Sequence, residues 1–187
     1  MSLRPKDVLE NDARRLFLRG VAGTCAVAAL SPRQLLAGDQ DERVLSFVHT
    51  HTHERLTVPY YAGGEYIPEG LKRLKAFLRD HRTGDEHEMD ASLFDLLNDL
   101  RLATGTKSPF QVISGYRSPR TNTMLREHGS GVSRGSLHLQ GRAIDIRLAD
   151  FGTAKLRDAA IKLGRGGVGY YKTSDFVHVD TGRVRRW

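Results

Sequence analysis

Residues 136–145 read SLHLQGRAID, and this stretch runs from a loop into a strand of alternating side chains. Successive side chains on a strand point to opposite faces, so Asp145 is expected to leave the face that Ile144 and Ile146 occupy. A carboxylate among apolar residues is costly to bury without a partner, and a metal ion is such a partner. A second alternating segment, FVHVD at residues 176–180, carries another candidate ligand, His178. The two segments therefore predict strands that support a metal site.

The three candidate ligands are His138, Asp145 and His178, which are of the types that a catalytic zinc ion takes. Two imidazole nitrogens and one carboxylate oxygen leave a fourth tetrahedral position open, and a water bound there ionises near neutral pH. A structural zinc site is more often closed by four ligands and rich in cysteine, whereas this chain has a single cysteine. Taken alone, His138 fits an ordinary loop histidine, and Asp145 fits a carboxylate bonded to a backbone turn. The combination favours one zinc ion per chain and an enzyme.

The order of the expected elements predicts an α+β fold with a largely antiparallel sheet flanked by helices, because strands and helices do not follow a repeating βαβ order. One helix is expected to begin at Asp90 and to end before Gly105. The other expected helical segments cover residues 68–82, 121–127 and 154–163. The expected strands form a hairpin over residues 43–61, broken at 50–54, a buried strand at 110–114, a strand at 142–148 and a closing hairpin at 168–171 and 176–180. Residues 129–135 are expected to form a Ser/Gly loop.

Residues 1–37 have the plan of an export signal. Arg14 and Arg15 precede apolar residues, and residues 20–30 form a run of small or apolar residues. A stable membrane-spanning helix needs about 20 residues, so this run is too short to remain in a bilayer. The arginine pair resembles the twin-arginine class of signals, which exports folded proteins in bacteria. We expect cleavage near Ala37 and a single mature domain at residues 38–187; the alternative is a basic amphipathic start followed by a buried helix.

Composition limits the other function classes. At 187 residues, 39% apolar and 27% charged, the chain has room for one ordinary domain with a core. Residues 1–37 contribute +3 to the formal charge of +7, and the remainder shows no basic stripe or known nucleic-acid motif. Nucleic-acid binding is therefore not expected, whereas a modest positive charge suits an anionic polymer such as a cell wall. The single cysteine excludes an intramolecular disulfide, and a monomer is the default expectation.

Three charged residues are candidates for further roles at the site. Arg117, within SGYRS at residues 114–118, is expected either to bind a substrate carboxylate or carbonyl or to tie a loop to the sheet. Asp180 is expected either to accept the second ring N–H of His178, fixing its tautomer, or to form a structural salt bridge. Asp175 is a candidate general base if the backbone aims it inward, and an exposed turn residue otherwise.

Other conspicuous residues give weaker indications. Tyrosines at positions 116, 170 and 171 either line a cleft or pack in the core. Alternating histidines at positions 49, 51 and 53 are expected at the exposed end of the first hairpin, with an adventitious metal patch as the alternative. The glycines of GGVG at 166–169 do not form a phosphate-binding loop, because no Lys-Ser/Thr pair follows them.

Together, these motifs resemble the zinc D-Ala-D-Ala carboxypeptidase superfamily, and within it the YcbK/MepK-type branch of exported murein endopeptidases. The resemblance covers most of residues 43–187 and rests on SGYRS, on Ser-x-His-x-x-Gly-x-Ala-x-Asp, on GGVGYY and on FVHVD. It implies a hedgehog/DD-peptidase-like zinc peptidase fold. It also implies that His138, Asp145 and His178 bind zinc and that Arg117 stabilises substrate and transition-state charge.

The resemblance extends to substrate contacts and shows one departure. Ser136 is implied to contact the substrate peptide, and Tyr170 is taken as a further substrate-binding residue. Dipeptidase members of the superfamily carry a glutamate three residues before the last ligand histidine, where this chain has Asp175. Aspartate is one methylene shorter, so the general-base role of Asp175 is the least supported of these assignments.

The resulting hypothesis is a zinc-dependent peptidase that hydrolyses peptide cross-links in bacterial peptidoglycan, with stem peptides as its partners and the periplasm or cell envelope as its location. After signal cleavage no stable membrane insertion is expected. One alternative is a carboxypeptidase or dipeptidase that trims D-Ala from stem peptides and recognises a free carboxylate. Another is a non-catalytic wall-binding module that keeps the fold.

Overall fold

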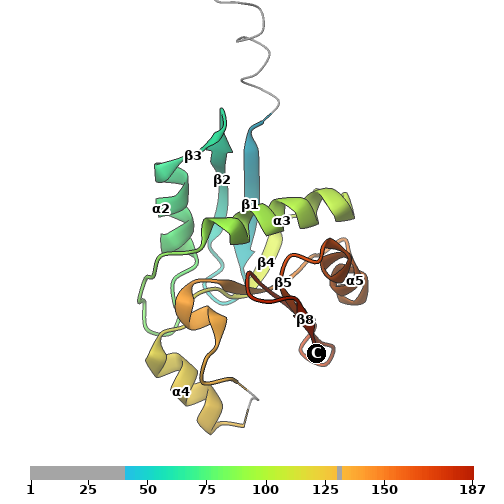
Figure 1. Ribbon diagram of the computed structural model, residues 1–187. Helices are drawn as coiled ribbons and strands as arrows, with labels where there is room; N and C mark the ends of the chain where they lie inside the picture. Colours follow the sequence, from blue (N-terminus) through green and yellow to red (C-terminus); the bar gives the residue numbers. More distant parts are fainter. Residues whose placement is uncertain (1–40, 130–131) are drawn as a thin grey trace, which may run out of the picture.

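The computed structural model describes residues 41–129 and 132–187, which form an eight-stranded sheet with helices packed on it (Figure 1). The predicted export signal lies outside the described residues, as does part of the predicted Ser/Gly loop. The strands are β1 (Arg43–His49), β2 (Arg55–Ala62), β3 (Glu65–Tyr66), β4 (Phe110–Ser114), β5 (Ala143–Arg147), β6 (Gly167–Tyr171), β7 (Phe176–Asp180) and β8 (Arg185–Arg186). The helices are α2 (Pro68–Phe77), α3 (Ala91–Thr104), α4 (Pro119–Glu127) and α5 (Thr153–Leu163), with a 3-10 helix, η1, at Leu137–Gln140.

The strand order across the sheet is β3-β2-β1-β4-β5-β7-β6-β8. Neighbouring strands are antiparallel except for two parallel pairs, β1 with β4 and β6 with β8. The two predicted hairpins are present as β1–β2 and β6–β7. The prediction of an α+β fold with a largely antiparallel sheet is therefore confirmed.

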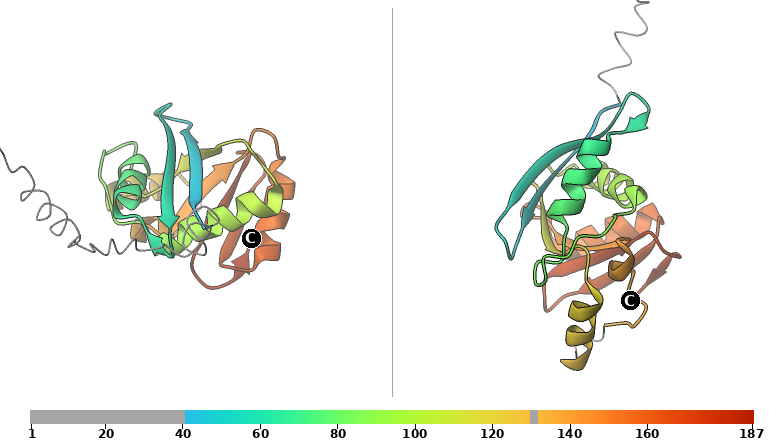
Figure 2. Two further views of the ribbon diagram at one scale, coloured as in Figure 1. Left: turned by 90° about the horizontal axis from the view of Figure 1, so that it is seen from above. Right: turned by 90° about the vertical axis from the view of Figure 1, so that its left-hand side faces the viewer.

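Helices α2, α3 and α5 lie on one face of the sheet, whereas α4 projects away from it (Figures 1 and 2). Helix α2 packs on β2, α3 on β1, and α5 on β6 and β7. The core between these layers includes Leu45, Phe47, Leu93, Leu97, Ile144, Ile146, Val177 and Val179. Side chains that alternate with the core residues of β5 and β7 face away from the helices, and these include Asp145 and His178.

The caps of α3 form as the sequence predicts. The Asp90 side chain accepts a hydrogen bond from the Ser92 backbone N–H, which satisfies one of the free amides at the helix start. Gly105 ends the helix in the left-handed conformation, with φ at 66°. No helix in the described part of the chain is both long enough and apolar enough to cross a membrane.

Other boundaries differ from the prediction. Helix α2 ends at Phe77 instead of Arg82, because the chain then turns around the buried side chain of Asp80. Asp80 accepts hydrogen bonds from the backbone N–H groups of Arg82 and Ser118, at 2.9 Å each. Helix α4 is longer than the predicted turn, since the Ser118 side chain caps it. The short strands β3 and β8 and the 3-10 helix have too few residues to show a period.

The expectation that the histidines at 49, 51 and 53 all lie at an exposed hairpin end is wrong for the first of them. His49 is 1% exposed, at the end of β1, whereas His51 and His53 are exposed. The alternation of β1 places His49 on the same face as Leu45 and Phe47, so it is covered by the core beneath α2.

Candidate metal centre

His138, Asp145 and His178 meet on the sheet face that α2, α3 and α5 leave uncovered. His138 lies on η1, while Asp145 on β5 and His178 on β7 are partners in the antiparallel ladder. All three residues are buried, and their ligand atoms lie within 4.8 Å of one another. His138 Nε2 lies 3.2 Å from Asp145 Oδ1 and 3.1 Å from His178 Nδ1. The structure thus brings together the three residues that the sequence predicted as ligands.

Hydrogen bonds on the outer side of each ring determine which nitrogen faces the cluster. His138 Nδ1 lies 2.6 Å from the carbonyl oxygen of Gly115, which can only accept, so Nδ1 carries the proton and Nε2 offers a lone pair. His178 Nε2 lies 3.0 Å from an Asp180 carboxylate oxygen, so it donates, and Nδ1 offers its lone pair 2.8 Å from Asp145 Oδ1. Two nitrogen lone pairs and a carboxylate therefore converge. This donor set fits a divalent cation such as Zn²⁺.

The electrostatics of the cluster also favour a cation. Burial lowers the pKa of His138, because desolvation disfavours the charged ring. Burial acts in the same direction on His178, but the two neighbouring carboxylates, Asp145 and Asp180, outweigh it and raise the pKa of His178. Burial opposes ionisation of Asp145, yet the two histidines lower its pKa. Asp145 is therefore a carboxylate, which places a negative charge among the buried ligand atoms.

Asp180 holds His178 in place with a carboxylate whose two oxygens each accept more than one hydrogen bond. One carboxylate oxygen accepts from the backbone N–H groups of Gly167 and Gly182, at 3.0 and 2.8 Å. The Arg185 guanidinium bonds both oxygens, at 3.0 and 2.7 Å. These interactions and the His178 ring lower the pKa of Asp180 although its burial opposes ionisation. Both roles considered for Asp180 are thus present: it fixes the His178 tautomer and forms a salt bridge.

The glycines of the GGVG segment have a structural role that the sequence did not reveal. A Cβ on Gly169 would lie 2.7 Å from the Trp187 ring, and one on Gly167 would lie 2.5 Å from Asp180 Oδ2. Gly169 is the ladder partner of His178, so its missing side chain lets the Trp187 ring lie 5.2 Å from the His178 ring, centroid to centroid. A glycine opposite a ligand on the neighbouring strand was the available signal for this close approach.

Arg117 lies beside the cluster with part of its hydrogen-bonding capacity unused. It is 8% exposed, and its Nη2 donates to Asp145 Oδ2 at 3.2 Å. Its Nε is buried and has no partner among the described residues. The Arg117 backbone N–H donates to the carbonyl oxygen of His138. Arg117 thus ties its loop to the sheet, as one alternative predicted, and it also keeps a free donor beside the cluster.

The cluster opens into a cleft of about 510 Å³. The cleft is also lined by residues that the sequence did not indicate as part of the site, among them His51, Arg82, Arg185 and Trp187. They come from the β1–β2 turn, the segment after α2 and the C-terminal strand, which only the folded chain brings near the ligands. Pockets of this size enclose ligands larger than an alanine dipeptide.

The predicted substrate contacts divide between two sides of the fold. Ser136 lines the cleft with the metal-centre residues. Tyr170 does not: it lines a separate cavity beneath the Arg157 guanidinium, which lies 4.7 Å from the centre of its ring. The neighbouring Tyr171 lines the cleft instead and accepts a hydrogen bond from Trp187 Nε1 at 3.0 Å. The reason is strand alternation, because Tyr171 shares the face of Gly169 and Tyr170 the opposite one.

Asp175 is not brought to the cluster. It lies in the turn between β6 and β7 with a positive φ of 52°. Its carboxylate accepts from Thr153 Oγ1 at 2.8 Å and lies 3.6 Å from Arg147 Nη1. The side chain is exposed and does not line the cleft, so its placement matches the predicted alternative of a turn residue.

Comparisons with known proteins identify the family of the chain. The family model described as peptidoglycan L,D-endopeptidase MepK matches residues 37–187. The chain is 39% identical over 178 residues to the peptidoglycan L,D-endopeptidase MepK of Escherichia coli strain K12, which covers 94% of this chain and 98% of the relative. It is 38% identical over 181 residues to a probable peptidoglycan L,D-endopeptidase MepK of Haemophilus influenzae, covering 95% of this chain and 96% of the relative.

Proposed function

The chain belongs to the family described as peptidoglycan L,D-endopeptidase MepK, and from this membership and its site we propose that it is a zinc-dependent peptidase that hydrolyses peptide cross-links in bacterial peptidoglycan. The observation that carries the proposal is the convergence of one nitrogen each from His138 and His178 with the Asp145 carboxylate, within reach of one ion, in an open cleft. The relatives are named peptidoglycan L,D-endopeptidases, which favours L,D cross-links as the bond that is cut.

The residues of the chain divide the work at the site. His138 Nε2, His178 Nδ1 and the Asp145 carboxylate would hold one zinc ion, which supplies Lewis-acid polarisation of a carbonyl and a water of lowered pKa. Asp180 keeps His178 in the required tautomer through the hydrogen bond to Nε2. Arg117 lines the cleft and has a buried Nε–H without a partner among the described residues, so its guanidinium can stabilise negative charge on a substrate oxygen.

The proton acceptor is not Asp175 in this arrangement. Its carboxylate is bonded to Thr153 and paired with Arg147 on the outside of the sheet. The cleft-lining residues that the structure describes include one carboxylate, that of Asp145. Asp175→Asn is therefore expected to change kcat less than about twofold, since exposed pairs of this kind contribute little.

An endopeptidase fits the cleft better than a carboxypeptidase does. The lining of the cleft extends from His51 on the β1–β2 turn to Trp187, so the cleft offers contacts well beyond a terminal dipeptide. We further propose export by the twin-arginine-type signal at residues 1–37, action in the periplasm and a monomeric mature enzyme. The support for export is the Arg14–Arg15 pair and the apolar run that follows it.

Digestion of purified cross-linked muropeptides tests the function. Zinc-loaded mature chain is compared with a His138→Ala variant, and the products are identified by mass spectrometry. Conversion of dimers to monomers by the wild type alone supports the proposal and identifies the bond. Release of terminal D-Ala without dimer cleavage would favour the carboxypeptidase, and zinc binding without either product would favour a wall-binding module.

A further inference from the structure

The charges that line the cleft are unbalanced. Three arginines line it, and the carboxylate among its described lining residues, that of Asp145, already faces two histidines. Arg117 donates to this carboxylate, and Arg185 donates to Asp180 through two nitrogens. In the part of the chain that the structure describes, no carboxylate pairs with the guanidinium of the third arginine, Arg82.

Arg82 adds to a cluster of like charge. Burial lowers the pKa of Arg117, and the charge of Arg82 acts in the same direction. Burial and then the charge of Arg82 also lower the pKa of His51, which lines the cleft as well. Arg82 is thus close enough to act on both the metal-centre arginine and the hairpin histidine. An anion that enters the cleft would relieve this repulsion.

The backbone at Arg82 is fixed relative to the metal centre by one buried carboxylate. Asp80 is 1% exposed, and one of its oxygens accepts from the Arg82 backbone N–H at 2.9 Å. The other oxygen accepts from the backbone N–H and hydroxyl of Ser118, at 2.9 and 2.7 Å, directly after Arg117. The backbone at Arg82 and the backbone directly after Arg117 are therefore held by the same carboxylate. A ligand that contacts both arginines finds their backbone positions already ordered, which lowers the entropic cost of binding.

From these contacts we propose that Arg82 is a specificity-determining residue that binds a free carboxylate of the substrate peptide, away from the bond that is cleaved. The inference rests on the proposed function and adds a recognition element to the same cleft. A guanidinium matches a carboxylate through two parallel N–H···O bonds, so an amide at the same position of the substrate binds less well. The exposed position of Arg82 allows its side chain to meet a ligand that enters from solvent.

The test pairs a change in the enzyme with a change in the substrate. Synthetic cross-linked peptides are prepared in which each free carboxyl group is converted in turn to the amide, and wild type and Arg82→Gln are assayed on each. For one carboxyl group, amidation is expected to raise KM of the wild type about tenfold with little change in kcat. Arg82→Gln should raise KM of the unmodified peptide by a similar factor and be insensitive to that amidation.

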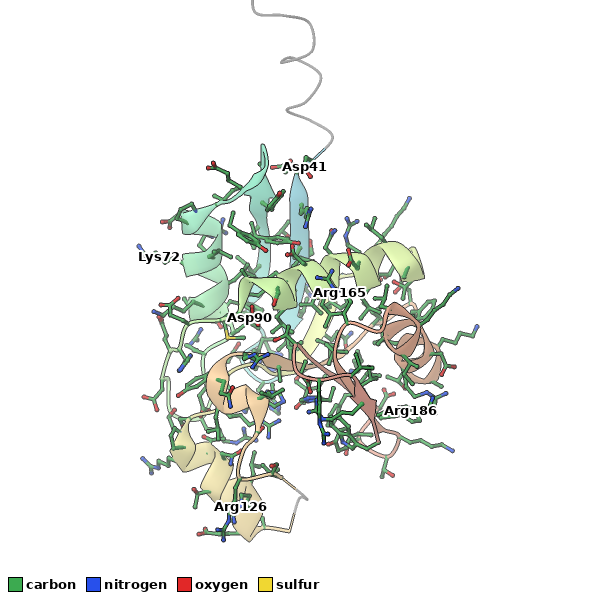
Figure 3. All side chains as sticks on the ribbon, viewed as in Figure 1. Asp41, Lys72, Asp90, Arg126, Arg165 and Arg186 are labelled. Atoms are coloured by element: carbon green, nitrogen blue, oxygen red, sulfur yellow. The ribbon has the colours of Figure 1, made fainter. Side chains whose placement is uncertain are left out.

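A control variant and a second readout make the result decisive. Arg126→Gln removes the same charge from α4, outside the residues that line the cleft, and should leave KM unchanged (Figure 3). Trp187 is the single tryptophan and lines the cleft, so its fluorescence reports peptide binding without turnover. Arg82→Lys, which keeps the charge but not the planar fork, should give an intermediate loss of affinity.

Two outcomes would overturn the proposal. Arg82→Gln could leave binding and KM unchanged, or its effect could add to that of every amidation, which would show that Arg82 contacts none of the carboxylates. If the wild type cleaves no cross-linked peptide, the proposed function fails. In that case the fluorescence titration of the same peptides still decides whether Arg82 recognises a carboxylate.

Discussion

Histidines gather at two places in the described residues, at the cleft and around the β1–β2 turn, and the group at the cleft is the one with the donor arrangement of a metal site. At the metal centre, the outer nitrogens of His138 and His178 donate to Gly115 and Asp180, so both inner nitrogens face the same position as the Asp145 carboxylate with their lone pairs free for an ion. His138, Asp145 and His178 are the group of possible ligands, among the described residues, whose ligand atoms lie close enough together to hold one ion.

The second group consists of His49, His51 and His81. Nδ1 of His49 faces the backbone N–H groups of His51 and Thr52, at 3.2 and 3.4 Å, so its lone pair is already used. Nε2 of His49 then carries the proton, and it is buried with no partner in residues 41–129 and 132–187. The rings of His51 and His81 stack with centroids 4.3 Å apart. Proximity of imidazoles is therefore not sufficient for a metal site, and the direction of their lone pairs distinguishes the proposed metal centre from the second group.

The largest expected effect comes from removing a ligand. His138→Ala should reduce zinc from one ion per chain to none and lower kcat/KM by about a thousandfold or more, because the site loses a buried donor nitrogen. His81→Ala serves as the matched control and should retain one ion per chain. Zinc content after dialysis, measured by mass spectrometry of the metal, distinguishes the two groups. Loss of zinc from the control alone would reverse the comparison.

The second-largest effect is expected from a change that disturbs the orientation of the His178 ring. Asp180→Asn keeps the shape but weakens the acceptor for His178 Nε2–H and leaves Arg185 without its carboxylate. Zinc affinity is expected to fall about 10- to 100-fold, as for other outer partners of metal-bound histidines. Competition with a fluorescent chelator measures the change. An affinity equal to that of wild type would show that the Asp180 contact does not orient His178.

Acid should affect the second group through stability. Burial lowers the pKa of His49 to about 4, from an ordinary value near 6.5. The unfolded chain therefore binds a proton at higher pH than the folded chain does, and folding stability falls as the pH is lowered from about 6.5 to 4. Over this pH interval, protonation of His49 is expected to lower the free energy of unfolding by about 2 kcal/mol.

His49→Asn tests this contribution, because its amide oxygen can accept the same backbone N–H groups without titrating. The comparison uses urea unfolding of wild type and variant at several pH values. The variant should lose less stability than the wild type over this interval. Parallel pH profiles would show that His49 does not titrate on unfolding, contrary to its observed burial.

The smallest expected effect concerns the packing of Trp187 against His178. Gly169→Ala places a Cβ about 2.7 Å from the Trp187 ring and should destabilise the fold by at least about 1 kcal/mol. Gly152→Ala is the control, since a Cβ there has no atom within 4 Å and φ is −59°. Thermal unfolding measures both variants. Equal melting temperatures would show that the ring can move away at no cost.

The sequence predicted the structure correctly where a single local pattern determines it. The alternation of β5 and β7 predicted which residues face the core, and the Asp90 and Gly105 signals predicted both ends of α3. The three ligands followed from residue chemistry together with family resemblance. Local patterns failed where long-range contacts decide, as at Asp80, whose bonds to Ser118 end α2 early.

The cleft shows the same division between local and long-range information. Tyr170 and Tyr171 are neighbours, and which of them faces the cleft depends on the register of β6 with β7. Trp187 and Arg82 carry no sequence signal of their own, because folding alone brings them to the site. Asp175 was a candidate by its spacing from His178, but its turn and its contacts direct the carboxylate elsewhere.

Anomalous diffraction from crystals of the mature chain, recorded at the zinc absorption edge, tests the assignment of the metal centre most directly. We expect one peak, in contact with His138 Nε2, His178 Nδ1 and the Asp145 carboxylate. A peak at His49, His51 and His81 instead, or no peak in protein that cleaves cross-linked muropeptides, would contradict the proposal that the first group of histidines is the metal centre of the enzyme.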